Sequence, residues 1–298
     1  KQVAVLVEIT ARFDEEPNIA WGEELEKAGA HVVYGMERLK THVKLALVIR
    51  EEEEKLCRYV HVSTGNYHTG TAKLYEDLGI LSCESELGAS VANVFNELTG
   101  ATPSLEYGPL LVAPHNLRES FIELIQREKA HCLAGNLSGI WAKMNQLQDP
   151  QIIRELYLAS QAGVPITLCV RGLCCLRAGV ANLSSTIRVF SILGRFLEHS
   201  RIYRFENGGK REYFIGSADW MLRNLDRRME TIMRVRDANI QKELDDIIMI
   251  YEKDNCFSWV MKKDNSYLRR RPKDDQASFS AQEEFIKIAG CLKPSNIN

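Results

Sequence analysis

The sequence predicts an α/β protein made of two tandem α/β domains, and three observations support this prediction. Apolar β-branched runs such as 3–9 and 164–170 are typical of strands that are covered on both faces. Segments with helical periodicity alternate with these runs, as they do in an α/β layer. Polar residues suited to chemistry occur twice, in the same order and at similar spacing, which indicates an internally duplicated unit.

The first half reads as strands around two helices. Asp14 and Pro17 are placed to begin a helix with an apolar stripe of Trp21, Leu25 and Ala28, and Gly29 ends it. The other expected elements are strands at 3–9, 31–34, 39–47 and 56–63, an acidic hairpin tip at 51–54 and a helix at 87–98. Thr102-Pro103 interrupts the pattern, so we expect one domain over 1–108 and a second over 109–298.

The second half repeats the alternation. Asp149-Pro150 places a cap and a proline at the start of a helix, and Gly163 ends it. The other expected elements are strands at 109–113, 139–144, 164–170, 187–193, 202–205 and 213–215, helices at about 116–129 and 237–252, and a hairpin turn at 207–210. A polar tail is expected to finish the chain.

Composition excludes several classes of protein. The 298 residues are 45% hydrophobic and 26% charged, with a formal net charge of −2, so any anion site must be local. Eight scattered cysteines without a C-x-x-C motif argue against a zinc ribbon or a disulfide framework and for a reducing compartment. Because no apolar run reaches the roughly 18 residues of a membrane span, we expect a cytoplasmic protein and leave peripheral membrane association open.

A histidine and a lysine two residues apart open the chemical argument. In a strand, His42 and Lys44 would project from the same face. Imidazole can form a covalent phosphoryl intermediate, and an ammonium offsets charge on phosphate oxygens. Taken alone, the triplet is more typical of two polar residues on the solvent face of a strand end, and only the rest of the chain reverses that interpretation.

Four polar features correspond between the halves. In order, they are Arg12 and Arg171, the triplets His42-x-Lys44 and His199-x-Arg201, Asn66 and Asp219, and Tyr75 and Arg228. The spacings are 30 and 28, 24 and 20, and nine and nine residues. Two copies related by a pseudo-twofold axis would bring both triplets to one cleft between the domains. One histidine would act as nucleophile, and the other as acid or base or as a clamp on phosphate.

The duplicated plan resembles the phospholipase D superfamily and, within it, the polyphosphate kinases. The matching segments are Ala11–Glu16, Gly65–Tyr67, Thr71–Tyr75, Val170–Gly172, Leu197–His199 and Ser217–Trp220. The resemblance covers only the two carboxy-terminal domains of that family. We therefore expect two phospholipase-D-like domains, truncated at the amino terminus, with further domains of the same chain as partners.

The resemblance implies reversible transfer of the ATP γ-phosphate to polyphosphate, with Mg²⁺ and without nucleic acid, in a homo-oligomer. His42 matches the phosphorylated residue, and Tyr75, Arg171 and His199 match positions that contact ATP and ADP. Arg12 matches a magnesium-phosphate site, but a guanidinium has no free lone pair, so it suits phosphate better than metal. Beyond the family assignments, Lys44, Arg201 and Arg228 would offset phosphate charge.

Two other functions stay open on the residues. Hydrolases of the superfamily usually carry an aspartate five residues after the lysine, where this chain has Ile49 and Glu206. This departure weakens the alternative of a phosphodiesterase or nuclease without removing it. A catalytically incomplete, polyphosphate-binding fragment is the third possibility. The run 269–273 reads as a solvated basic loop rather than as the lining of a polyanion tunnel.

Overall fold

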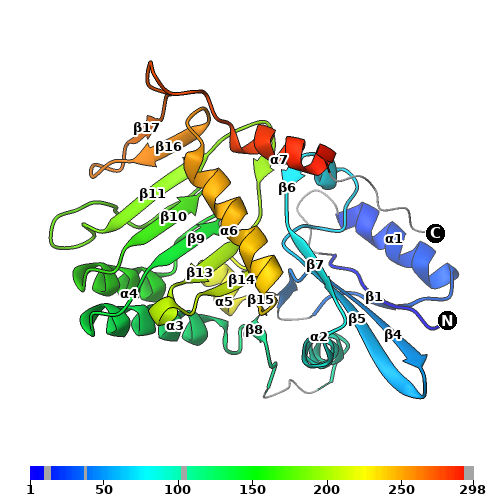
Figure 1. Ribbon diagram of the computed structural model, residues 1–298. Helices are drawn as coiled ribbons and strands as arrows, with labels where there is room; N and C mark the ends of the chain where they lie inside the picture. The colour runs from blue at the N-terminus through cyan, green and yellow to red at the C-terminus, as the bar shows by residue number, and fades with distance from the viewer. Residues whose placement is uncertain (10–14, 37–38, 102–105, 292–298) are drawn as a thin grey trace.

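A large mixed sheet forms the centre of the computed structural model, which describes residues 1–9, 15–36, 39–101 and 106–291 (Figure 1). Its strand order is β17 (Tyr267–Arg269), β16 (Ser258–Met261), β11 (Ile187–Ile192), β10 (Ile166–Val170), β9 (Ile140–Met144), β13 (Ile202–Phe205), β14 (Glu212–Gly216), β15 (Arg228–Val235) and β3 (Lys40–Thr41). A further strand, β8 (Leu110–Ala113), also pairs with β15. The neighbours β9, β10 and β11 are parallel, as expected from the helix between β9 and β10.

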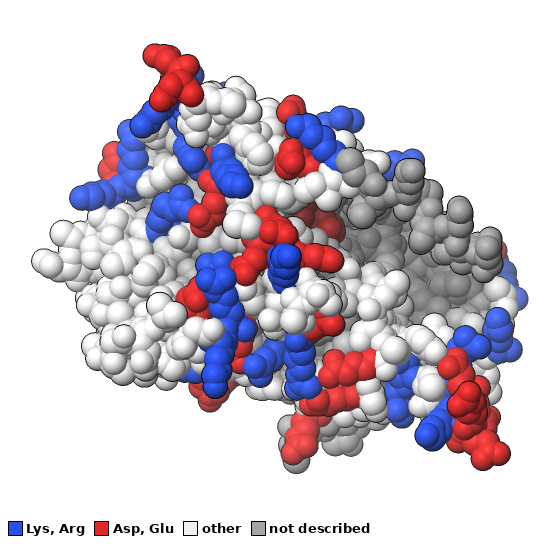
Figure 2. Space-filling model, in the orientation of Figure 1, with Lys and Arg blue, Asp and Glu red and all other residues white. Residues whose placement is uncertain are grey.

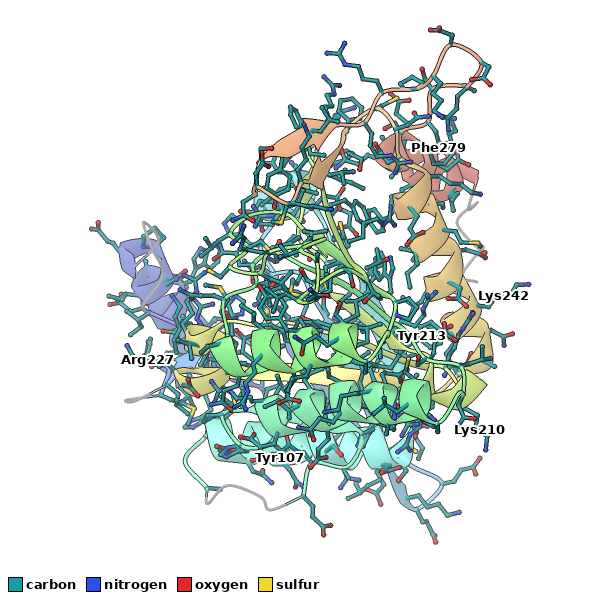
Figure 3. All side chains as sticks on the ribbon, turned by 90° about the vertical axis from the view of Figure 1, so that its left-hand side faces the viewer. Tyr107, Lys210, Tyr213, Arg227, Lys242 and Phe279 are labelled. Atoms are coloured by element: carbon teal, nitrogen blue, oxygen red, sulfur yellow. The ribbon has the colours of Figure 1, made fainter. Side chains whose placement is uncertain are left out.

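The sheet is covered on both faces. In β9, the side chains of Ile140, Ala142 and Met144 join one core, whereas Trp141 joins the other, because strand residues alternate between faces. Helices α3 (Leu117–Leu133) and α4 (Pro150–Gln161) lie side by side over the first core, where Figure 3 shows them in green. Helices α6 (Ala238–Lys253) and α7 (Ala281–Cys291) contribute to the second core. Buried apolar surface thus holds both sides of the strands that lead to the site.

The first half packs against the second core. It contains the parallel pair β1 (Ala4–Leu6) and β2 (His31–Val33), helix α1 (Glu15–Lys27), the antiparallel strands β4 (Leu45–Glu52), β5 (Lys55–Ser63) and β7 (Gly79–Ser82), and helix α2 (Ser85–Leu98). Val60, Val62 and Val91 share a hydrophobic cluster with Trp141 and Ile202 of the large sheet. The two halves are therefore joined by a continuous core.

Two short parallel pairings also join the halves. Strand β3 of the first half pairs with β15 of the second. In the same way, β6 (Tyr75–Glu76) of the first half pairs with β12 (Leu197–Glu198) of the second. Each pairing leads directly into one of the two histidine triplets. Short helical turns η1 (Thr71–Lys73), η2 (Asn207–Gly209) and α5 (Leu222–Asp226) complete the connections.

Three expectations about secondary structure are wrong. The expected strand 39–47 is interrupted, because residues 42–44 lie between β3 and β4 outside any strand. The expected apolar stripe of α1 is not buried: Trp21 is 68% exposed, and the buried residue is Gly22, packed against Tyr34. The expected polar tail contains β16, β17 and α7. The sequence patterns also did not predict β15, because only tertiary pairing buries the polar residues of this strand.

The basic run 269–273 begins in β17 and makes structural contacts. Arg269 donates from Nε and Nη2 to the Cys256 carbonyl, and Arg270 donates to the Glu252 carbonyl at 2.8 Å. Lysine and arginine are interspersed with aspartate and glutamate over the face shown in Figure 2. Among the described residues, no helix is long and apolar enough to span a membrane.

Candidate active site

Each triplet histidine is held by a carboxylate from the opposite half of the chain. His42 Nδ1 lies 2.8 Å from Glu230 Oε2, and His199 Nδ1 lies 2.7 Å from Asp77 Oδ1. Because an ionised carboxylate only accepts hydrogen bonds, Nδ1 carries the proton in both rings. A neutral His42 then keeps a lone pair on Nε2 that is suited to attack. The Nε2 lone pair of His199 instead accepts from Arg201 Nη1 at 3.2 Å, which suits His199 to a role in holding phosphate or moving a proton.

Backbone pairing fixes these contacts. The amide of His42 donates to the Met229 carbonyl at 2.9 Å, and the amide of His199 donates to the Glu76 carbonyl at 3.1 Å. In each case the carboxylate residue follows the accepting residue directly. The cross-half strand pairs β3–β15 and β6–β12 therefore set each histidine beside its acid.

The supporting hydroxyl residues also correspond between the two halves. The amide of Thr64 donates to the Leu78 carbonyl, and the amide of Ser217 donates to the Thr231 carbonyl, both at 2.9 Å. Thr64 Oγ1 also donates to Asp77 Oδ1 at 2.7 Å. Thr64 Oγ1 accepts from the Leu78 amide at 2.9 Å, and Ser217 Oγ likewise accepts from the Thr231 amide at 3.1 Å. The duplication predicted from spacing thus extends to individual hydrogen bonds.

The two triplet cations are buried beside their own histidines. Lys44 Nζ donates to the carbonyl of His42, and Arg201 Nη1 donates to the carbonyl of His199 at 2.7 Å. Residues 42–44 lie outside any strand, so strand alternation, which we expected, does not place Lys44 beside His42. Arg201 also donates from Nε to Asp219 at 3.1 Å, so this carboxylate orients the guanidinium.

Burial and charge keep His42 neutral. Burial lowers the pKa of His42 to about 4, against the raising effect of Glu230, and Lys44 and Arg201 lower it further. Burial also lowers the pKa of His199, and the same two cations add to that effect. The charges of the same two cations, Lys44 and Arg201, therefore act on both histidines.

The acid behind His42 stays ionised. Burial raises the pKa of the Glu230 carboxyl, but His42 and Lys44 outweigh that effect and bring the pKa down to about 2. Burial lowers the pKa of Lys44 to about 7. Near neutral pH, His42 thus combines a neutral ring with a charged hydrogen-bond acceptor on Nδ1, which is the state required of a nucleophile.

Arg171 and Tyr75 border the His199 side. Arg171 Nε donates to Asn145 Oδ1 at 2.9 Å, and Asn145 Nδ2 donates to the His199 carbonyl at 3.2 Å. The backbone amide of Asn145 also donates to Asp219 Oδ1 at 2.8 Å. The ring of Tyr75 lies 5.0 Å from the ring of His199, centroid to centroid. These predicted residues are therefore brought together around one histidine.

The remaining predicted residues are placed less uniformly. Arg228 lies beside the His42 acid, with Nη1 3.8 Å from Glu230 Oε1. Asn66 is exposed, whereas its counterpart Asp219 is buried, and it is the Thr64 carbonyl that accepts from Arg201, at 3.4 Å. Arg12 lies outside the described residues.

Sequence reasoning missed three residues of the site. Asp77 stands two positions after Tyr75, and Glu230 stands two positions after Arg228, which corresponds to Tyr75 in the repeat. Extending the comparison of the two halves by two residues would therefore have found both acids. Asn145 has no such signal. It follows directly after β9 and becomes visible only when this strand end is placed beside His199.

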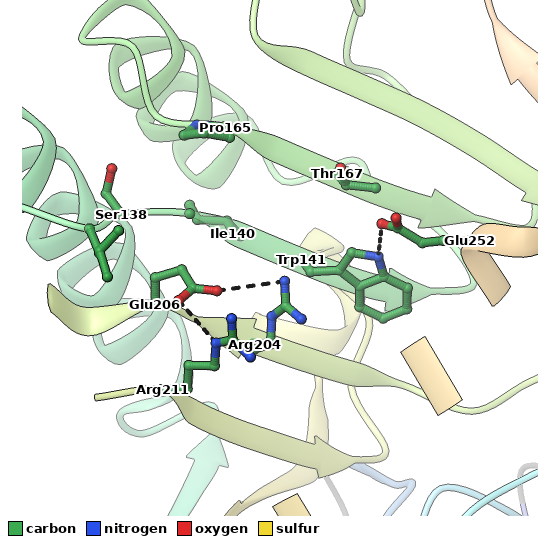
Figure 4. A pocket seen from close by; sticks show the side chains of 11 residues that line it. Ser138, Ile140, Trp141, Pro165, Thr167, Arg204, Glu206, Arg211 and Glu252 are labelled. Atoms are coloured by element: carbon green, nitrogen blue, oxygen red, sulfur yellow. Dashed lines mark hydrogen bonds and ion pairs between the residues drawn. The ribbon is translucent and has the colours of Figure 1, made fainter. Parts of the chain in front are cut away.

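A separate pocket lies at the start of β9 and the end of β13, away from the strand ends that lead to the histidines (Figure 4). Glu206, which stands five residues after Arg201, lines this pocket and accepts from Arg211 Nε at 3.0 Å. The residue at the position of the hydrolase aspartate is thus directed away from the histidines. Ile49, its counterpart in the first half, lies exposed in β4.

The fold and the site define a duplicated α/β protein with two carboxylate-held histidines and two buried cations at the junction of its halves. Comparison with known proteins is more specific. Residues 1–104 match the model for polyphosphate kinase C-terminal domain 1, and residues 110–282 match that for C-terminal domain 2. The chain therefore belongs to the polyphosphate kinase family.

Individual relatives agree with this assignment. The polyphosphate kinase of Synechocystis sp. is 54% identical over 289 residues, which are 97% of this chain and 40% of that protein. The polyphosphate kinase of Pseudomonas aeruginosa is 44% identical, over 96% of this chain and 42% of that protein. The crystal structure of polyphosphate kinase from Porphyromonas gingivalis matches with a TM-score of 0.89 at 36% identity, over 97% of this chain and 44% of that one. The chain thus spans about two fifths of the length of these relatives.

Proposed function

We propose that the protein containing this chain transfers the γ-phosphate of ATP reversibly to polyphosphate through a phosphohistidine on His42. The observation that carries the proposal is the buried Glu230 carboxylate on Nδ1 of a neutral His42. This contact leaves Nε2 free to attack phosphorus. Family membership supports the same reaction.

The bonds of the proposed cycle balance in two steps. His42 Nε2 forms a P–N bond to the γ-phosphorus of ATP while the bond to the ADP oxygen breaks. A terminal oxygen of polyphosphate then forms a P–O bond to this phosphorus while the P–N bond breaks, which returns the electron pair to Nε2 and restores the neutral ring. Lys44, Arg171 and Arg201 would offset charge on the phosphoryl oxygens, with Arg228 near His42.

Magnesium would enter as part of the nucleotide substrate. Among the described residues, no group of three or more His, Cys, Asp or Glu side chains is arranged to hold a metal ion. The carboxylates nearest the histidines already accept hydrogen bonds from His42, His199 and Arg201. Phosphate oxygens and water would therefore supply most of the ligands to Mg²⁺, which favours such a shell. Arg12 would contact phosphate.

The further domains, the oligomeric state and the location of the protein are also proposals. Because the relatives are about two and a half times as long, further domains of the same polypeptide would complete the nucleotide and polyphosphate sites. We propose a cytoplasmic homo-oligomer and leave its contact with membranes open.

The decisive experiment uses the full-length polypeptide with γ-labelled ATP and magnesium, followed by denaturation. We expect protein-bound label that survives alkali and is lost in acid, as a phosphohistidine would be. His42→Ala should abolish it, whereas the control His31→Ala, at an exposed position on β2, should retain it.

The other outcomes separate the alternatives. Label that persists in a folded His42→Ala variant would show that the roles of the two histidines are assigned wrongly. Cleavage of a phosphodiester without added metal, in place of labelling, would indicate the hydrolase. Binding of polyphosphate with neither activity would indicate a chain that only binds.

A further inference from the structure

Lys143 is a fully buried cation that the proposed reaction does not use. It stands on β9, is 1% exposed, and points to the face that carries Trp141 and the second core. A lysine is almost never buried to this extent unless its ammonium is paired. Its partners should therefore explain why the fold retains it.

The partners of Lys143 come from both halves of the chain. Its Nζ lies 3.0 Å from Glu76 Oε2 of β6 and 3.0 Å from Glu198 Oε2 of β12, and it donates to Ser200 Oγ at 2.8 Å. Ser200 Oγ in turn donates to Glu76 Oε2 at 2.8 Å. One ammonium thus bridges two carboxylates and a hydroxyl across the junction between the halves.

These partners are the chain neighbours of the His199 pair. Glu76 directly precedes Asp77, and Glu198 and Ser200 flank His199. Asp77 and His199 meet through a single 2.7 Å hydrogen bond between side chains of different halves. Their relative position therefore depends on how β6 and β12 are held together, and the Lys143 cluster lies directly behind that pairing.

The other histidine lacks such a cluster. By repeat spacing, Met229 corresponds to Glu76, and Thr41 and Val43 correspond to Glu198 and Ser200. Met229 belongs to the second core. At the described positions that correspond to Glu76, Glu198 and Ser200, the His42 triplet therefore has no charged side chain.

Helix α7 anchors the cluster from a third direction. Gln282 Nε2 donates to Glu198 Oε1 at 2.7 Å and to the Phe196 carbonyl at 2.9 Å, and its Oε1 accepts from the Phe196 amide at 2.9 Å. The stretch 196–200 is thus held on both sides, by Lys143 and by Gln282.

We propose that Lys143 is a positioning residue that holds β6 and β12 together so that Asp77 faces Nδ1 of His199. The inference rests on the proposed phosphotransfer function. A buried ion cluster adds little net stability compared with apolar packing, but it selects one geometry strongly, because each charge must find its partner. Lys143 acts through His199 and contacts no reacting atom in this role.

The test is a double-mutant cycle in the full-length protein, assayed as ATP-dependent growth of polyphosphate. Lys143→Met keeps the length of the side chain and removes the charge. We expect kcat to fall about 10- to 100-fold while KM for ATP changes little, because misplacing a group in the transition state costs this much. In an Asp77→Ala background, Lys143→Met should cost much less, since both changes disturb one contact.

A matched control separates positioning from general stability. Glu128 is fully buried and accepts the amides of Gly139 at 3.0 Å and Asn207 at 2.8 Å, near the opposite end of β9. Glu128→Gln should lower the melting temperature and leave kcat within about twofold of the unmodified protein. If Lys143→Met does not fold, Glu76→Gln provides the same test in the cycle with a nearly isosteric side chain.

Two results would overturn the inference. One is a Lys143→Met protein with lowered stability and normal kcat. The other is a Lys143→Met variant whose loss of kcat is as large in the Asp77→Ala background as in the unmodified protein. An unmodified protein that transfers no phosphate would instead reject the proposed function.

Discussion

At the scale of single residues, the site depends on which nitrogen of each histidine carries a proton. Glu230 Oε2 accepts from His42 Nδ1, while its other oxygen accepts from the Asn224 side-chain amide. Both acceptor positions of the carboxylate are therefore in use. The residue repeat identified His42 and Lys44, but the acid that sets the tautomer comes from 188 residues away and depends on tertiary structure.

Glu230→Gln should impair phosphorylation of His42 severely. An amide has only one acceptor end, so its NH₂ group must face either Asn224 or His42 Nδ1. Facing His42, it would favour the tautomer that protonates Nε2 and removes the nucleophile. We expect labelling from γ-labelled ATP to slow by about 10²-fold or more.

Glu212→Gln is the matched control for this prediction. Glu212 is also a buried glutamate, but its carboxylate pairs with Arg127 and Arg234 away from the histidines. This variant should label at a normal rate. Equal labelling by both variants would show that Glu230 does not direct the chemistry.

At the scale of elements, the sequence patterns predicted most helices and central strands but missed those whose partners lie far away. Helix α4 begins where Asp149 caps it, with Oδ1 accepting the amides of Gln151 at 3.0 Å and Ile152 at 2.9 Å. That signal is local and so can be read from sequence. Strand β15 is different: it contains Glu230, Thr231 and Arg234, and only its pairing with β14, β8 and β3 makes it a strand.

The β4–β5 hairpin offers a prediction at this scale. Its two tip residues, Glu53 and Glu54, have φ of 49° and 63°, in the left-handed region that disfavours side chains with a Cβ. Asn-Gly suits a two-residue turn of this kind. We expect Glu53→Asn/Glu54→Gly to stabilise the protein by about 1–2 kcal/mol, measured as a higher melting temperature. Glu51→Asn, within the strand, should give no gain; an equal gain would point to charge and not to backbone conformation.

At the scale of the whole molecule, the two halves are mutually dependent. Each supplies the carboxylate for the histidine of the other, and Val60 and Val62 of the first half share a core with Ile202 of the second. Buried histidines and carboxylates at such a junction should couple folding stability to pH.

Stability should fall as the pH drops below about 6.5. Burial lowers the pKa of His42 from 6.5 to about 4, so between these values the unfolded chain binds a proton that the folded chain does not. The pKa of Glu230 falls from 4.5 to about 2, because His42 and Lys44 outweigh burial. Glu230 therefore also makes stability fall as the pH drops below 4.5. In urea unfolding at a series of pH values, His42→Ala should lose part of the slope above pH 4.5, on the order of 1–3 kcal/mol over the window. An unchanged slope would contradict this assignment.

The sequence by itself determined the α/β class, the duplication and the two histidine triplets, because each is written in local composition, periodicity or spacing. Only the tertiary structure decided that the ammonium of Lys44 bonds the His42 carbonyl outside any strand, and that Asp77 and Glu230 each hold the histidine of the opposite half. It also decided that Lys143 is buried between Glu76 and Glu198. The physical reason is that a contact between side chains far apart in the sequence, such as His42 with Glu230, leaves no periodic trace in the chain. It exists only once the strands that carry those residues have paired.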